Sequence, residues 1–167
     1  MPIVRNLEEY YDNDLLKSIR SIINGSTNFI LTKILEDQLE FKAALTLAQQ
    51  LGFAESDPKL DIGGFDAANK LSILLAHSFG VMAKPGAFVF NGIENISLPD
   101  AIVARQKRQT IKLVAQAKKL SNEKLAAFVL PQFVTAKDDL YHAQNEFNAL
   151  TTESTFADAD FFKGKGA

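Results

Sequence analysis

The chain has 167 residues and a formal charge of −2, from 18 lysine and arginine residues against 20 aspartate and glutamate residues. Apolar residues make up 47% and charged residues 23%, which excludes a disordered composition and fits one globular domain over residues 1–167. A sequence without cysteine excludes disulfide scaffolds, thiolate metal sites and a cysteine nucleophile, and its two histidines cannot build a multi-histidine metal site.

The sequence gives no sign of a membrane segment. Its longest unbroken apolar run, Leu125–Leu130, is far shorter than the ~18 residues that a membrane span requires. The N-terminus has no basic stretch followed by an apolar run, so no secretory signal is predicted. We therefore expect a cytoplasmic protein with no membrane partner, and a charge this close to zero gives no general attraction to nucleic acid.

The N-terminal quarter of the chain is predicted to be mixed in structure. An extended start at Pro2–Val4 precedes a short helix at Leu7–Tyr11 and a strand at Leu16–Ile23. The turn Asn24–Asn28 can begin a helix over about residues 28–36, with Ser26 or Thr27 as its cap.

The next segment predicts two helices joined by a polar loop. Apolar residues recur at helical spacing from Phe41 and indicate a helix that ends near Gly52. Phe53–Gly64 is acidic and contains one proline and two adjacent glycines, so it is predicted to be a loop. A helix then runs from about Asp66 to Phe79 and is closed by Gly80.

The C-terminal half predicts one helix and several strands. Ser97–Asp100 is a strong helix start, and that helix ends near Lys107. Three strands are predicted, at Ile111–Lys118, Leu125–Val134 and Phe147–Thr151. Pro131 indicates a bulge or an edge position, and Phe161–Ala167 reads as a loop. Without regular strand–helix alternation, the class is α+β, a mixed sheet with helices packed mainly on one face.

The helix at 66–79 carries the first candidate for chemistry. On a helical wheel Asp66, Lys70, Ile73 and His77 share one narrow stripe, while apolar residues occupy most of the circumference. A buried helix would partly desolvate Lys70. Desolvation lowers the pKa of a lysine and a neighbouring carboxylate raises it, so a lysine under both effects can exchange a proton near neutral pH. The alternative is a surface pair in which Asp66 caps the helix; His77 fits a core or rim position better than a base.

The acidic segment before this helix is the second candidate. Four carboxylates fall within twelve residues, at Glu55, Asp57, Asp61 and Asp66. Such a cluster can hold a substrate ammonium group or a divalent cation, and it can also be a solvated loop. Gly63–Gly64 allow a ligand close to the backbone, or they make the turn.

Two further segments carry weaker signals. The Asn24–Asn28 turn offers backbone N–H groups to a carboxylate, as any capped helix does. The basic stretch Arg105–Lys119 can touch phosphate, but a solvated surface explains it better. The sequence contains no glycine-rich dinucleotide fingerprint and no phosphate-binding loop.

Three blocks together resemble one family. Ile22–Leu31, Leu51–Pro58 and Leu60–Leu71 are similar to the substrate and catalytic domain of homoserine dehydrogenases, and Pro2–Arg5 and Gly164–Ala167 fit its ends. That family interconverts L-homoserine and L-aspartate 4-semialdehyde with NAD(P), on the path to threonine and methionine. The resemblance implies the same oxidoreductase activity for the protein to which this chain contributes.

The resemblance also implies a role for each matching residue. Lys70 would give and take the proton at the substrate oxygen, with Asp66 as its partner. Glu55 and Asp61 would hold the substrate amino and hydroxyl groups. The turn would contact the substrate through two residues, Gly25 and Ser26.

The chain departs from the family pattern in several places. Ser26 stands where threonine is common, and Phe53 where tyrosine often occurs. The resemblance implies a nucleotide-binding domain before Pro2 and a further segment after Ala167, neither of which is in this sequence. We therefore expect no cofactor-binding residues and no metal site here, with NAD(P) bound by the full-length enzyme.

The expected behaviour of the chain follows from the same resemblance. It would fold, form a homodimer through its sheet, and be inactive alone. The alternative is a non-catalytic ligand-sensing or dimerisation module with the same fold. Nucleic-acid binding through Arg105–Lys119 is the weakest possibility.

Overall fold

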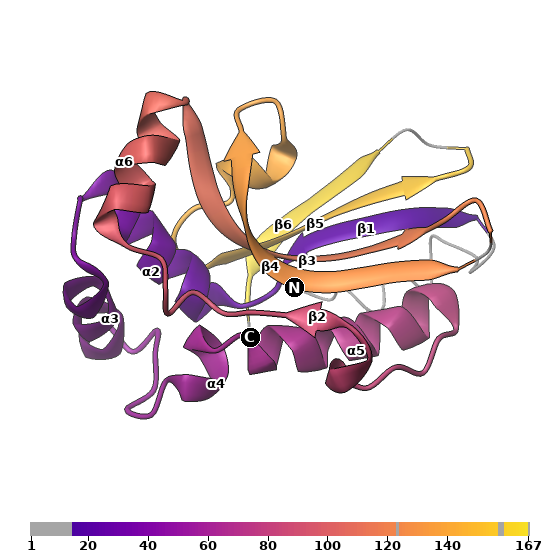
Figure 1. The fold of residues 1–167 in the computed structure, drawn as a ribbon, viewed down its shortest axis with the longest axis horizontal. Helices are drawn as coiled ribbons and strands as arrows, with labels where there is room; N and C mark the ends of the chain where they lie inside the picture. The colour runs from indigo at the N-terminus through magenta and orange to yellow at the C-terminus, as the bar shows by residue number, and fades with distance from the viewer. Residues whose placement is uncertain (1–14, 123, 157–158, 167) are drawn as a thin grey trace.

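The computed structural model describes residues 15–122, 124–156 and 159–166. The extended start expected at Pro2–Val4 and the helix expected at Leu7–Tyr11 lie outside these residues. Within the described ranges the strands form a six-stranded sheet in the order β2-β4-β3-β1-β5-β6 (Figure 1). The β2–β4 pair is parallel and the other neighbours are antiparallel.

The strands differ greatly in length. Their bounds are β1 Leu16–Ile22, β2 Val89–Phe90, β3 Gln109–Lys119, β4 Leu125–Thr135, β5 Phe147–Ser154 and β6 Asp160–Lys165. The long hairpin β3–β4 keeps one unbroken register, from the Gln109–Thr135 pair to the Lys119–Leu125 pair. This hairpin and β1 form the centre of the sheet.

The helices lie mainly on one face of the sheet, as expected. They are α2 Gly25–Glu36, α3 Phe41–Gln50, α4 Lys59–Ile62, α5 Phe65–Phe79 and α6 Leu98–Gln106, with 3₁₀ turns η1 Pro85–Ala87 and η2 Asp139–His142. Figure 1 shows α5 running beneath the sheet, with α2 on the same side and η2 on the opposite side. This arrangement confirms the predicted α+β class.

The main hydrophobic core lies between this helical layer and the sheet. Alternate residues of β3 face the helices and are almost fully buried: Ile111, Leu113, Ala115 and Ala117. They pack with Leu71 and Leu75 of α5 and with Ile30 and Ile34 of α2. The period of two in β3 and the apolar face of α5 are thus matched surfaces of one core. A smaller cluster on the other face packs under η2 around Leu140.

The helix ends explain most of the boundaries. α5 ends at Gly80, which adopts a left-handed conformation with φ 66°, as its glycine predicts. Ser97 and Asp100 form the expected reciprocal capping box at the start of α6. At α2 the expected cap is wrong, because Asn24 rather than Ser26 or Thr27 accepts the backbone N–H of Thr27, so the helix begins at Gly25.

Two local expectations are wrong, and a third, for Pro131, is decided in favour of the edge position. The segment 53–64 is not all loop, because it contains the one-turn helix α4. The C-terminal residues expected to be a loop include strand β6 (Asp160–Lys165), which pairs with β5 along its whole length. Pro131 makes no bulge: it pairs with Leu113 in an unbroken ladder, and it lies beyond the two β4 residues that pair with β2. Its missing N–H is tolerated at this open edge.

In the part of the chain that the structure describes, every helix is too short or too polar to span a bilayer.

Candidate active site

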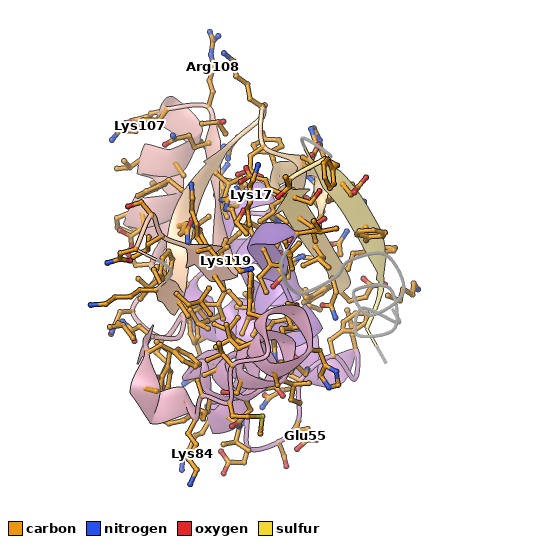
Figure 2. The ribbon with its side chains drawn as sticks, turned by 90° about the vertical axis from the view of Figure 1, so that its right-hand side faces the viewer. Lys17, Glu55, Lys84, Lys107, Arg108 and Lys119 are labelled. Carbon is orange, nitrogen blue, oxygen red and sulfur yellow. The ribbon has the colours of Figure 1, made fainter. Side chains whose placement is uncertain are left out.

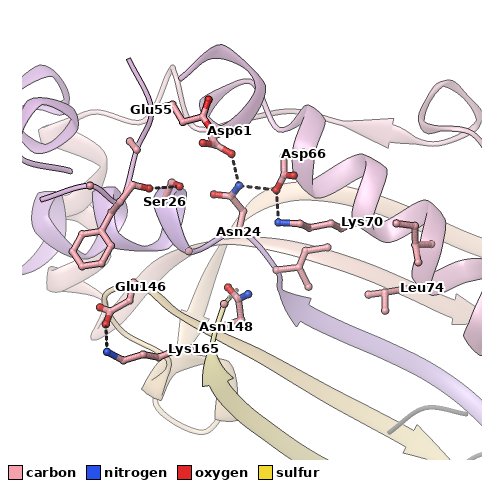
Figure 3. A pocket seen from close by; sticks show the side chains of 17 residues that line it. Asn24, Ser26, Glu55, Asp61, Asp66, Lys70, Leu74, Glu146, Asn148 and Lys165 are labelled. Atoms are coloured by element: carbon pink, nitrogen blue, oxygen red, sulfur yellow. Dashed lines mark hydrogen bonds and ion pairs between the residues drawn. The ribbon is translucent and has the colours of Figure 1, made fainter. Parts of the chain in front are cut away.

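A cavity of about 800 Å³ opens where three parts of the chain meet (Figure 3). The first turn of α2 forms one wall, and the segment from Gly52 to Asp61 with the first turns of α5 forms the second. The ends of β5 and β6 supply the third. All six residues expected at the site line this cavity: Gly25, Ser26, Glu55, Asp61, Asp66 and Lys70.

Lys70 and Asp66 form an ion pair along α5. The Nζ atom of Lys70 lies 2.8 Å from Oδ2 of Asp66, one helical turn earlier. The Lys70 side chain is 47% exposed and that of Asp66 is 30% exposed. The pair therefore stands at the mouth of the cavity, where a ligand can reach the ammonium group.

This exposure corrects one expectation, that α5 is buried on nearly all sides. One face of α5 is buried, but Ile73 is 50% and Phe65 49% exposed, both on the surface. The helical wheel counted apolar side chains without knowing what covers them. Lys70 is consequently not desolvated within the described chain.

Asn24 connects the carboxylates of the cavity. Its Nδ2 donates to Oδ1 of Asp61 at 2.7 Å and to Oδ2 of Asp66 at 2.8 Å (Figure 3). Asn24 is 4% exposed and is also the cap of α2. Its role in the cavity was not expected, although its place immediately before Gly25 and Ser26 in the turn was a usable signal.

The turn residues are held by backbone contacts. The Ser26 hydroxyl donates to the carbonyl oxygen of Phe53 at 2.5 Å, which links α2 to the segment that carries Glu55. A Cβ atom on Gly25 would lie 2.8 Å from the backbone oxygen of Glu146, so this position requires glycine. Gly25 thus brings the chain before β5 against the first turn of α2.

The C-terminal strands add polar residues that were not expected in the site. Lys165 of β6 lies 3.2 Å from Glu146, and Asn148 of β5 lines the same cavity. The pKa of Glu146 is lowered most by a hydrogen bond from the backbone N–H of Glu146 itself. A hydrogen bond from Lys165 lowers it further. These residues lie 76 to 95 positions beyond Lys70 in the chain, so no local motif could have indicated them.

The cavity carries an excess of negative charge. Four carboxylates line it, at Glu55, Asp61, Asp66 and Glu146, against the two ammonium groups of Lys70 and Lys165. This balance favours a ligand with a positively charged group over a simple anion. Among the described residues no group of three or more carboxylate or imidazole side chains is placed to hold a metal ion.

Gly63 and Gly64 serve the packing of the backbone. Gly64 has φ 82°, and a Cβ atom there would lie 3.0 Å from the backbone of Asn91. A Cβ atom on Gly92 would lie 1.8 Å from the carbonyl oxygen of Ile62. The turn reading of the glycine pair is therefore correct, and the contact with residues 91–92 fixes α4 and the start of α5.

The basic stretch at 105–119 does not form one charged face. Lys107 and Arg108 stand at one end of β3 and Lys119 at the other, about 30 Å apart along a strand of this length (Figure 2). Between them Lys112 is 1% exposed, and its Nζ donates to Oδ1 of Asn28 and to the carbonyl oxygen of Ala143. Burial lowers the pKa of Lys112 to about 8.

The described residues contain no dinucleotide-binding turn of the usual kind. The parallel strands β2 and β4 share two residue pairs, and neither leads through a glycine-rich turn into a helix. A pyrophosphate site of the usual kind needs such a turn at a helix N-terminus. Within the described residues we therefore assign no atoms to a nicotinamide dinucleotide.

Comparisons with known proteins point to one family for this chain. The family model for homoserine dehydrogenase matches residues 2–167. A homoserine dehydrogenase of Bacillus subtilis is 34% identical over 167 residues, covering all of this chain. The solved structure of a Thiobacillus denitrificans homoserine dehydrogenase has a TM-score of 0.93 and 30% identity over all of this chain and 38% of that one.

A further solved structure contains a cofactor. It is a mutant of a hyperthermophilic archaeal homoserine dehydrogenase in complex with NADPH, with a TM-score of 0.78 and 30% identity over 99% of this chain and 46% of that one. The chain spans about 38% of the length of the curated relatives that it matches.

Proposed function

The chain belongs to the homoserine dehydrogenase family, and from this premise we propose that residues 1–167 form the substrate-binding and catalytic domain of an enzyme that interconverts L-homoserine and L-aspartate 4-semialdehyde. The observation that carries the proposal is the cavity in which the Lys70–Asp66 pair lies beside Asp61 and Glu55. The lysine of this cavity can stabilise negative charge on a reacting oxygen, and the carboxylates of the cavity can bind the ammonium group of an amino acid.

Substrate binding uses the negative side of the cavity. Glu55 and Asp61 accept hydrogen bonds from the amino and hydroxyl groups of homoserine, and charge-assisted bonds of this kind are the strong ones. Gly25 and Ser26 contact the substrate from the first turn of α2. The Ser26 hydroxyl already donates to the Phe53 carbonyl, so its oxygen acts toward a substrate as an acceptor.

Lys70 acts at the oxygen that changes oxidation level. As the aldehyde carbon is reduced, negative charge grows on its oxygen, and a cationic lysine beside it stabilises that charge and then supplies the proton. In the oxidation direction the same amine accepts the hydroxyl proton. Asp66, whose Oδ2 lies 2.8 Å from Nζ, holds the amine in place.

NAD(P) supplies or accepts the hydride in this reaction. Because the described residues carry no glycine-rich turn of the dinucleotide-binding kind, we propose that residues outside them hold its pyrophosphate. A homoserine dehydrogenase that this chain resembles was solved in complex with NADPH. The chain alone is then expected to bind homoserine but not to turn it over. Turnover of semialdehyde by the 167-residue chain with NADPH would contradict this.

We also propose that the domain forms a homodimer through the sheet face opposite α2 and α5. Strand alternation places Phe128, Leu130 and Phe161 on that face, half-buried or exposed, and η2 covers one end of it. Light scattering should give a mass near twice 18.4 kDa for the wild type and a lower mass for Leu130→Glu. A monomeric wild type would contradict the dimer.

The experiment that tests the function is a calorimetric titration of the chain with L-homoserine, L-threonine and L-norvaline. Homoserine should bind, and norvaline, which lacks the hydroxyl, should bind at least tenfold more weakly because the carboxylate partner is left unpaired. A ligand-sensing module would instead bind an amino acid yet tolerate Lys70→Met in the full-length enzyme. Failure of homoserine to bind would contradict the proposal.

A further inference from the structure

Asn24 holds one amide in a fixed orientation. Its Oδ1 accepts the backbone N–H of Thr27 at 2.8 Å, and its own carbonyl oxygen accepts the Thr27 hydroxyl at 3.0 Å. Because the cap bond occupies the oxygen end of the amide, the nitrogen end must point away from α2. The side chain is 4% exposed, so water does not compete for it.

The nitrogen end of this amide meets two carboxylates from two different helices. One Nδ2 atom carries two hydrogens, and its two acceptors are Asp61 of α4 at 2.7 Å and Asp66 of α5 at 2.8 Å. Both donors are therefore used. Two carboxylates this close repel each other, and a neutral amide between them offsets that repulsion without cancelling either charge.

The bridge leaves the outward side of both carboxylates available. In the described part of the chain, Oδ1 of Asp66 and Oδ2 of Asp61 have no protein hydrogen-bond partner, and both residues line the cavity. Oδ2 of Asp66 also receives Lys70. Asn24, at the start of α2, is thus bonded to Asp61, the expected substrate ligand, and through Asp66 it is connected to Lys70, the expected proton carrier.

We propose that Asn24 is a positioning residue for the reaction: its amide fixes the separation of Asp61 and Asp66, and through Asp66 it sets where the Lys70 ammonium stands. The inference rests on the proposed function and adds a residue to it. Asn24 touches no reacting atom itself. Its effect is geometric, and a misplacement of about 1 Å in such a site can cost roughly 10²-fold in rate.

The choice of asparagine follows from the double duty of the side chain. Serine at this position keeps an oxygen that can cap α2. Its side chain has no NH₂ group, so it cannot donate hydrogen bonds to two carboxylates. Aspartate keeps the cap but places a third negative charge against Asp61 and Asp66. Both replacements are good N-caps, so neither removes the helix start.

The test uses Asn24→Ser and Asn24→Asp in the full-length enzyme, with Ser97→Ala as the matched control at the cap of α6. We expect kcat for homoserine to fall about 10- to 100-fold in Asn24→Ser and at least as far in Asn24→Asp, with KM raised in both. Their melting temperatures should fall as well, because each variant leaves the Asp61 and Asp66 carboxylates without the amide between them. Ser97→Ala should lower the melting temperature and leave kcat unchanged.

Three outcomes would overturn the inference in distinguishable ways. A folded Asn24→Ser enzyme with kcat and KM within twofold of wild type removes the positioning role and leaves the proposed function standing. A wild-type enzyme that does not oxidise homoserine removes both. If both variants fail to fold, side-chain amide NMR of asparagine-labelled wild type decides: homoserine must shift the Asn24 NH₂ signals, and unshifted signals refute the role.

Discussion

The Nζ atom of Lys70 lies 2.8 Å from Oδ2 of Asp66, and the same carboxylate oxygen accepts a hydrogen bond from Asn24 at 2.8 Å. An exposed i, i+4 pair alone contributes a few tenths of a kcal/mol to helix stability. Here the pair is joined to a second carboxylate, Asp61, and faces a large cavity. The arrangement is thus better suited to binding and proton transfer than to stability.

Removing the charge of either carboxylate proposed as a substrate ligand should weaken substrate binding. Asp61→Asn and Glu55→Gln in the full-length enzyme are expected to raise KM for homoserine about 10- to 100-fold, since each loses one charge-assisted hydrogen bond. Steady-state kinetics measures this directly. Asp57→Asn is the matched control, because Asp57 is an exposed carboxylate in the same segment that does not line the cavity; an equal effect there would contradict a specific role.

Gly92 should be the most sensitive glycine of the fold. Its added Cβ would lie 1.8 Å from the Ile62 carbonyl oxygen, so Gly92→Ala must displace α4 or the chain at 91–92. We expect a loss of about 2–4 kcal/mol in the free energy of unfolding, as for other strained core changes. Urea denaturation measures it, with Gly86→Ala as control because nothing lies within 4 Å of the Cβ there. Equal stability of the two variants would contradict the packing described.

The buried Lys112 should make stability depend on alkaline pH. Its pKa falls from 10.5 to about 8 on folding because of burial. Between these two pKa values Lys112 holds a proton in the unfolded chain but not in the folded chain. The free energy of unfolding therefore rises with pH from about 8 to 10.5. Below pH 8 the contribution of Lys112 to this free energy is constant.

The comparison of Lys112→Met with wild type isolates this effect. Urea denaturation at pH 7.5 and pH 10 should show a rise with pH that is about 1–3 kcal/mol smaller in the variant. Lys118→Met is the control, since Lys118 is exposed on the same strand. If the variant kept the wild-type pH dependence, the charge on Lys112 would not be what lowers the free energy of unfolding near neutral pH.

The local parts of the fold were predictable from the sequence. The glycine stop of α5, the capping box at Ser97 and the alternation of β3 each depend on neighbouring residues, and each is confirmed. The gathering of Glu55, Asp61, Asp66 and Lys70 was predictable for the same reason, because they lie within one short stretch of chain.

The rest of the site depends on contacts across the sequence. Glu146 and Lys165 reach the cavity through the sheet order, which no motif encodes. Lys112 alternates with apolar residues like a solvent-facing side chain, but η2 and Asn28 cover that face. The exposure of Lys70 is likewise a property of what packs on α5 and not of its own pattern.

We propose that Lys70 moves the proton at the substrate oxygen, and the most direct test is kcat for homoserine oxidation in Lys70→Met. We expect a loss of about 10²- to 10⁴-fold at saturating homoserine, with a nearly unchanged melting temperature. Lys33→Met, which breaks a similar i, i+4 pair with Asp37 outside the cavity, should keep wild-type kcat. A Lys70→Met enzyme with more than one tenth of wild-type kcat would contradict the account.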